Sequence, residues 1–164
     1  MVRHDKEFYT VRGYALRRQD ENVLTSSMED YLEMAFRLGK DKGYTRMGDL
    51  AEALHVQPPS ASKMVRKLAD MGYFNYEKYG VVEFTDLGRE TGEYLLKRHE
   101  TIEKFLMMIG VRQNILEDTE KMEHNISDET YQMMIIFLQF MQQNIHWQEM
   151  YKKFSSISSN NFGT

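Results

Sequence analysis

The feature that most constrains this chain is the order of elements that its residue pattern predicts between residues 26 and 84. A first helix in SSMEDYLEMAFRL is followed by a short helix in RMGDLAEALHV, where Leu50, Ala51 and Leu54 recur at helical spacing. The two prolines of QPP mark the start of a third helix, because proline is tolerated in a first helical turn. Two aromatic and β-branched runs then flank KYG and predict a β-hairpin. This order predicts a winged helix-turn-helix.

The first helix carries both core and polar candidates. We expect Ser26 to be its N-cap, with Glu29 three residues later completing a capping box. Its apolar face consists of Met28, Tyr31, Leu32, Ala35 and Phe36. Two carboxylates, Asp30 and Glu33, lie together beside that face because they are three residues apart.

The third helix, in SASKMVRKLADMGY, has two faces of different character. Its predicted core face is apolar and consists of Ala61, Met64, Val65 and Leu68. Its outer face is small and basic, which suits the phosphates and base edges of a DNA major groove. From helix geometry we expect base-edge contacts from Gln57, Ser60 and Lys63, and phosphate contacts from Ser62, Arg66, Lys67 and the hairpin residue Lys78. The alternative is that these helices and the hairpin form only a packing unit.

The second half of the chain is helical by its pattern. Thr85 is expected to cap a long helix that contains His99 and closes at Gly110. An acidic helix in LEDTEKMEHNISDE follows, and Ser127 caps a last helix that runs through SDETYQMMIIFLQFMQQNIHWQEMYKKF. The middle of that helix is apolar nearly all round, so it needs cover that a twin subunit would supply.

These patterns divide the chain into four segments. They are an N-terminal extension (1–25), a winged helix-turn-helix domain (26–92), an all-helical domain (93–154) and a polar, disordered tail (155–164). The extension is either a disordered arm or an ordered segment in which aromatic residues pack on the body and Arg17 and Arg18 approach DNA.

Six oxygen and nitrogen donors stand on three of the predicted helices. They are Asp30 and Glu33, then His99, then Glu120, Glu123 and His124. Six donors are enough for two ions, and a site without sulfur suits manganese or ferrous iron, although the usual affinity order favours zinc or copper. The residue pattern leaves open whether the helices converge. The alternative is an ordinary acidic surface and a buried histidine with its own partner.

Composition limits the remaining classes of protein. The chain of 164 residues has no cysteine, which excludes disulfides, thiolate nucleophiles and sulfur-rich metal sites. No apolar run is long enough to cross a bilayer and the first residues lack the centre of a signal peptide, so we expect a cytoplasmic protein without a membrane partner. The net charge of −4 argues mildly against nucleic acid, but the local distribution of charge decides that.

Several ordered motifs resemble one family. The runs SMEDYLE, LAEALHVQPPSASKMVRKL, YEKY, RHETIEKFL and EKMEH, within residues 26 to 154, are similar to the diphtheria toxin repressor family and to its branch of manganese transport regulators. The resemblance implies a mainly α fold, with an N-terminal winged helix-turn-helix followed by an all-helical metal-binding and dimerisation domain. It carries the family's metal ligands onto Asp30, Glu33, His99, Glu120, Glu123 and His124.

Two positions favour the manganese branch. Iron-responsive members have methionine where Asp30 stands and cysteine where Glu120 stands, and here both are carboxylates. The resemblance therefore implies a manganese sensor that binds two Mn²⁺ ions per subunit, while Fe²⁺, Zn²⁺ or Cd²⁺ can bind in vitro. An ancillary site of iron-sensing members has a histidine where this chain has Leu116, although Glu103 stands at the matching acidic position.

The implied function is metal-activated repression of metal-ion uptake genes, by a homodimer that forms through its C-terminal helices and binds a double-stranded DNA operator. An ion held by donors of both domains would fix the angle between them. The alternatives are an iron-responsive or broadly divalent-metal-responsive repressor of the same family and a metal-independent winged-helix regulator. A di-metal carboxylate enzyme needs paired glutamate and histidine motifs on two helices, and only one helix here comes near that pattern, so we expect no enzymatic activity.

Overall fold

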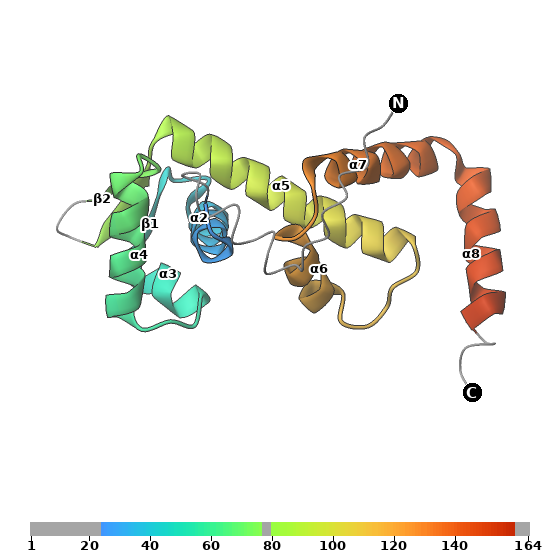
Figure 1. Ribbon diagram of the computed structural model, residues 1–164, viewed down its shortest axis with the longest axis horizontal. Coiled ribbons are helices and arrows are strands. Elements are labelled where there is room, and N and C mark those ends of the chain that lie inside the picture. Colours follow the sequence, from blue (N-terminus) through green and yellow to red (C-terminus); the bar gives the residue numbers. More distant parts are fainter. Residues whose placement is uncertain (1–23, 77–79, 160–164) are drawn as a thin grey trace, which may run out of the picture. The chain divides into compact units, whose positions relative to one another are not determined.

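The computed structural model describes residues 24–76 and 80–159 (Figure 1). The chain divides between Leu95 and Leu96 into two compact units, which we call the N-terminal unit and the C-terminal unit. The boundary predicted from the sequence lies after residue 92. Both positions fall inside one long helix, α5 (Asp86–Met108).

The N-terminal unit combines helices with a small antiparallel sheet. Its elements are α2 (Ser26–Gly39), β1 (Tyr44–Arg46), α3 (Met47–Ala53), α4 (Pro58–Asp70), β2 (Phe74–Tyr76), β3 (Val81–Phe84) and the first part of α5. The predicted hairpin is β2 and β3, which pair with Phe74 opposite Phe84. The strand β1 was not predicted. It pairs with the other side of β3, Thr45 opposite Val82, and gives the sheet order β1-β3-β2.

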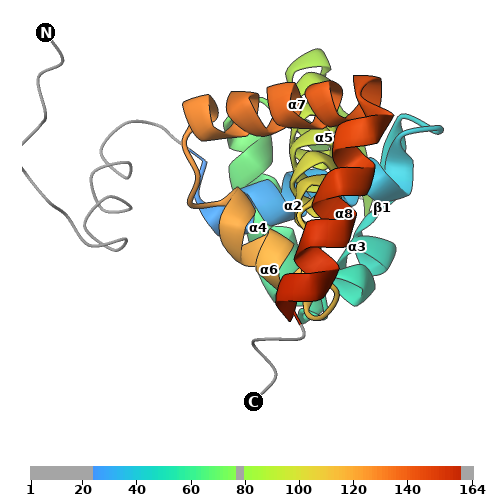
Figure 2. The ribbon, with the colours of Figure 1, turned by 90° about the vertical axis from the view of Figure 1, so that its right-hand side faces the viewer.

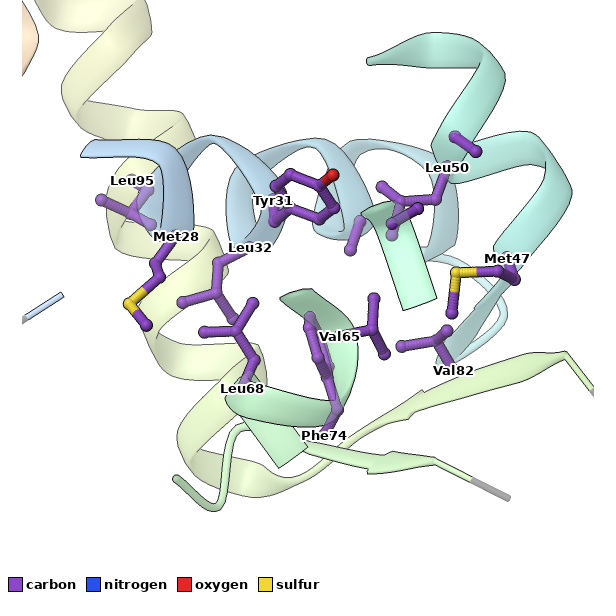
Figure 3. Close-up of a cluster of buried hydrophobic side chains, with 13 residues drawn as sticks. Met28, Tyr31, Leu32, Met47, Leu50, Val65, Leu68, Phe74, Val82 and Leu95 are labelled. Carbon is purple, nitrogen blue, oxygen red and sulfur yellow. The ribbon is translucent and has the colours of Figure 1, made fainter. Parts of the chain in front are cut away.

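One contiguous core holds the N-terminal unit together (Figure 3). Side chains of α2, α3, α4 and the sheet meet there, with Leu32, Leu50 and Val65 fully buried. All five apolar residues predicted for the first helix are buried. Met64, predicted to be in the core, is only half-buried. Removal of this much apolar surface from water is the main favourable contribution to the stability of the unit.

The first helix begins one residue earlier than predicted. Thr25, and not Ser26, is the N-cap: its backbone is extended and its Oγ1 accepts a hydrogen bond from the Met28 amide at 3.4 Å. Ser26 is the first residue of α2 itself, whereas an N-cap residue precedes the helix and has non-helical backbone angles. The two other predicted caps are confirmed, because Thr85 Oγ1 accepts from the Gly88 amide at 3.0 Å and Ser127 Oγ from the Thr130 amide at 3.2 Å.

The C-terminal unit contains the rest of α5, α6 (Ile115–Glu123), α7 (Asp128–Gln143) and α8 (Ile145–Ser159). The prediction of one last helix was wrong, because the helix is interrupted at Asn144 and α8 runs in a different direction from α7 (Figures 1 and 2). Asn144 leaves the helical conformation with φ −128° and ψ 71°, and its side-chain amide donates to the Phe140 carbonyl at 2.7 Å.

Parts of the predicted ends can be compared with the structure. Helix α8 continues to Ser159, so the prediction of a disordered tail from residue 155 was wrong for residues 155–159. The predicted extension up to residue 23, the hairpin residue Lys78 and residues 160–164 lie outside the described residues.

The core of the C-terminal unit is small. Ile102 and Leu106 of α5 pack with Met134 of α7, and Phe105 meets Phe137 edge to face with ring centroids 5.6 Å apart. Large apolar side chains of α7 and α8 remain exposed: Met133, Ile136, Phe140, Ile145, Trp147, Met150 and Phe154. We call these seven residues the α7–α8 apolar face. Exposed apolar side chains on two neighbouring helices are typical of a surface that another molecule covers.

Among the described helices, none combines the length and the apolar character that crossing a membrane requires.

Candidate metal centre

Four of the six predicted donors converge within the C-terminal unit. His99 comes from α5. Helix α6 contributes Glu120 and Glu123, and its C-cap residue is His124. Residues three and four apart lie on one face of a helix, so the three α6 donors point in a common direction. The His99 Nδ1 atom lies 2.9 Å from Glu123 Oε2 and 3.7 Å from Glu120 Oε1. His124 Nε2 lies 3.5 Å from the other oxygen of Glu123.

Glu123 is the centre of this cluster. It is only 2% exposed, and each of its carboxylate oxygens faces a different imidazole. A buried carboxylate is costly unless a cation or hydrogen-bond donors compensate its charge. His99 is buried as well, whereas Glu120 is exposed at the edge of the cluster.

The donor chemistry of these four residues fits a divalent cation. They offer carboxylate oxygen and imidazole nitrogen and no sulfur, which suits manganese, ferrous iron or zinc better than a soft ion. The same atoms that form the His99–Glu123 hydrogen bond are the ones that would coordinate an ion. This cluster therefore differs from a solvated acidic helix face, which was the alternative reading of EKMEH.

The remaining two donors lie on α2 in the N-terminal unit. Asp30 is half-buried and Glu33 is buried. Glu33 Oε1 accepts a hydrogen bond from Arg37 Nε at 2.8 Å and lies 2.6 Å from Arg37 Nη2, an ion pair. That Asp30 and Glu33 join the other four donors around an ion stays a prediction.

The predicted DNA-contacting residues that the structure describes lie on or just before α4. Gln57, Ser60, Lys63, Arg66 and Lys67 are exposed and Ser62 is half-buried. Burial raises the pKa of the Tyr31 phenol on α2, and the Ser60 hydroxyl at the start of α4 opposes this rise.

Sequence reasoning missed Arg37. Its signal is present in the chain, because an arginine four residues after a glutamate on a helix is placed to pair with it. At the predicted ancillary position, Leu116 is exposed and offers no donor atom, and Glu103 is half-buried.

Two protein-family models match successive parts of the chain. The model of the iron dependent repressor N-terminal DNA binding domain matches residues 23–82, and the model of the iron dependent repressor metal binding and dimerisation domain matches residues 85–152. These two matches meet at the start of α5.

Curated relatives match the greater part of this chain. An HTH-type transcriptional regulator MntR of Lysinibacillus sphaericus is 44% identical over 121 residues, which are 73% of this chain and 87% of that protein. A regulator of the same name from Geobacillus kaustophilus is 49% identical over 104 residues, or 63% of this chain and 74% of that protein.

A solved structure described as the manganese regulator SloR aligns with a TM-score of 0.60 and 29% identity. The alignment covers 69% of this chain but only 54% of that chain, so this chain spans about half of its length. Together with the two domain matches and the curated relatives, these likenesses show that the chain belongs to the iron-dependent repressor family, whose members are metal-responsive, DNA-binding transcriptional repressors and not enzymes.

Proposed function

We propose that this protein is a manganese-responsive, metal-activated repressor of metal-ion uptake genes. The observation that carries the proposal is the convergence of His99, Glu120 and His124 on the buried carboxylate of Glu123. A carboxylate buried in that position needs a group that compensates its charge, and a divalent cation held by the four donors would do so. These side chains would hold the ion, and a bound manganese would supply the positive charge that compensates the carboxylates.

We propose the same six ligands that the sequence suggested, for two ions per subunit: Asp30, Glu33, His99, Glu120, Glu123 and His124. Manganese is favoured because both positions at which iron-responsive relatives have sulfur ligands, Asp30 and Glu120, are carboxylates here. The description of SloR as a manganese regulator supports the same metal. Ferrous iron, zinc and cadmium have the same ligand preferences in part and would bind in vitro.

The link to DNA follows from the location of the donors. Two lie in the N-terminal unit, which carries the residues proposed to contact DNA, and four lie in the C-terminal unit. Without a cation these carboxylates repel one another. Neutralising them favours one arrangement of the units and lowers the repulsion between the protein and a polyanion.

Dimerisation through α7 and α8 is part of the proposal. The α7–α8 apolar face is exposed in the single chain, and a second copy would cover it. In a two-fold dimer, the two α4 helices must be about 34 Å apart to enter successive major grooves. Base-edge contacts are proposed for Gln57, Ser60 and Lys63, and phosphate contacts for Ser62, Arg66, Lys67 and Lys78.

The test is DNA binding to a candidate operator upstream of a metal-ion transporter gene. Affinity is measured at fixed salt in chelator and with added manganese, ferrous iron or zinc, for wild type and Glu123→Ala. We expect manganese to tighten binding manyfold in wild type and not in the variant. The matched control is Glu117→Ala, an exposed glutamate of α6 that pairs with Lys121 at 2.6 Å and should leave the response intact.

Equal affinity in chelator and in manganese would contradict metal activation. It would favour the metal-independent winged-helix regulator, and the four-donor cluster would then be a hydrogen-bonded core feature. A response to iron that exceeds the response to manganese would keep the repressor but change its metal.

A further inference from the structure

Arg37 and Glu33 form an ion pair of unusual geometry on α2. Arg37 Nε donates a hydrogen bond to Glu33 Oε1 at 2.8 Å, and Arg37 Nη2 lies 2.6 Å from the same oxygen. Two nitrogens of the guanidinium therefore face one oxygen of the carboxylate.

This ion pair differs from the ion pairs that are common on exposed helix surfaces. Glutamate followed by a cation four residues later is common on exposed helices, as in Glu100 with Lys104 and Glu117 with Lys121. In those pairs both side chains are exposed. Here the Glu33 side chain is only 11% exposed while that of Arg37 is 36% exposed. One partner is held in the protein interior and the other reaches it from the surface.

We propose that Arg37 is a positioning residue that holds Glu33 in the metal-free protein and competes with manganese for its carboxylate, and so raises the metal concentration at which the protein responds. This inference rests on the proposed function, in which Glu33 is a metal ligand. It adds a residue that the ligand set does not contain.

The physical reason is a competition between two cations for one carboxylate. Any ion that binds Glu33 has to share it with Arg37 or displace the guanidinium. The guanidinium lies near enough to the surface to return to water, where its charge is well solvated. Part of the free energy of metal binding is therefore spent on weakening the Arg37–Glu33 pair.

The experiment is calorimetric titration of the full chain with manganese, at fixed salt and without DNA. Arg37→Gln should bind manganese about two- to fivefold more tightly than wild type, which corresponds to the strength of a partly exposed ion pair. Arg37→Lys keeps a point charge but loses the planar guanidinium that faces Glu33 with two nitrogens, so its affinity should lie between the two. Arg89→Gln, which removes an exposed arginine from α5, is the matched control and should leave the affinity unchanged.

Thermal unfolding supplies a second readout with an opposite sign. In chelator, Arg37→Gln should melt slightly below wild type, because the ion pair is lost. The rise in melting temperature on adding manganese should nevertheless be larger in the variant. A purely structural role of Arg37 predicts that both quantities fall together.

Two variants separate the possible failures. If Glu33→Gln binds manganese as tightly as wild type, Glu33 is not a ligand and the ligand assignment fails. If Glu33→Gln weakens binding but Arg37→Gln leaves it unchanged or weakens it, the ligand assignment stands and the competition by Arg37 is refuted.

Discussion

The two units of this molecule solve the problem of apolar burial differently. In the N-terminal unit, helices α2, α3 and α4 and a three-stranded sheet enclose one core in which Leu32, Val65 and Val82 are fully buried. In the C-terminal unit, a small cluster around Ile102 leaves the α7–α8 apolar face in solvent, with Ile145 67% and Phe154 70% exposed. The N-terminal unit is complete within one chain, whereas the C-terminal unit needs further partners.

The same contrast applies to polar groups. The N-terminal unit presents its basic side chains outward on α4, where DNA can reach them. The C-terminal unit turns a carboxylate and an imidazole, Glu123 and His99, into its interior. A small unit with a modest core gains stability from a bound ion or from a second subunit, since each binds only the folded state. We therefore expect metal and dimerisation to stabilise mainly the C-terminal unit.

The largest expected effect comes from shortening one buried side chain in the core of the N-terminal unit. Leu32→Ala removes a fully buried side chain and should lower the free energy of unfolding by about 2–5 kcal/mol. Urea unfolding, monitored by one spectroscopic probe in each unit, measures this change. The loss should be the same at every protein concentration, because this core does not depend on a second subunit. A loss that shrinks at high concentration would contradict the self-sufficiency of the N-terminal unit.

A close backbone approach gives the next largest effect. A Cβ atom at Gly88 would collide with the Tyr73 carbonyl oxygen where α5 starts against the hairpin. Gly88→Ala should therefore destabilise the N-terminal unit by about 1–3 kcal/mol. At Gly48 in α3, by contrast, a Cβ meets nothing within 4 Å. Gly48→Ala should stabilise by about 0.4–1 kcal/mol in the same unfolding assay, because alanine restricts the unfolded chain.

A charge placed on the α7–α8 apolar face should dissociate the dimer without unfolding the single chain. Ile136 is exposed on α7, so Ile136→Glu should leave the fold of a single chain intact. It should raise the dimer dissociation constant at least about tenfold, since a charge is placed in an apolar interface. Sedimentation equilibrium measures this, with Ile136→Leu, which keeps the position apolar, as control. An unchanged dimer would exclude this face as the interface.

Helix caps give the smallest difference between the units. Thr25→Ala and Ser127→Ala each remove a hydroxyl that accepts a backbone amide, and each should cost about 1 kcal/mol. The loss at Ser127, which starts α7, should become smaller at high protein concentration because dimerisation supports that helix. The loss at Thr25 should not. Chemical denaturation at two protein concentrations compares them.

Local patterns predicted the elements of this fold well where the information is local. The apolar spacing of α2, the prolines before α4 and the hydroxyls of Thr85 and Ser127 each act within a few residues, and the structure contains them. Strand β1 was missed because three residues are too few for an alternating pattern, and only its pairing with β3 stabilises it.

The remaining misses also have physical causes. The break between α7 and α8 depends on one Asn144 side chain that competes for the Phe140 carbonyl, in a stretch with otherwise helical character. For the metal centre, helical spacing placed Glu120, Glu123 and His124 on one face. Their approach to His99 is a contact between α5 and α6, which only the fold reveals. Arg37 was overlooked because it is not itself a donor for a metal.

The most direct test of the central claim is a manganese titration with and without operator DNA at fixed salt. If metal binding activates DNA binding, the two are thermodynamically linked, and operator must tighten manganese binding by the same factor by which manganese tightens operator binding. We predict equal factors well above one in wild type and factors near one in Glu123→Ala. Identical manganese affinities with and without operator in wild type would contradict the account.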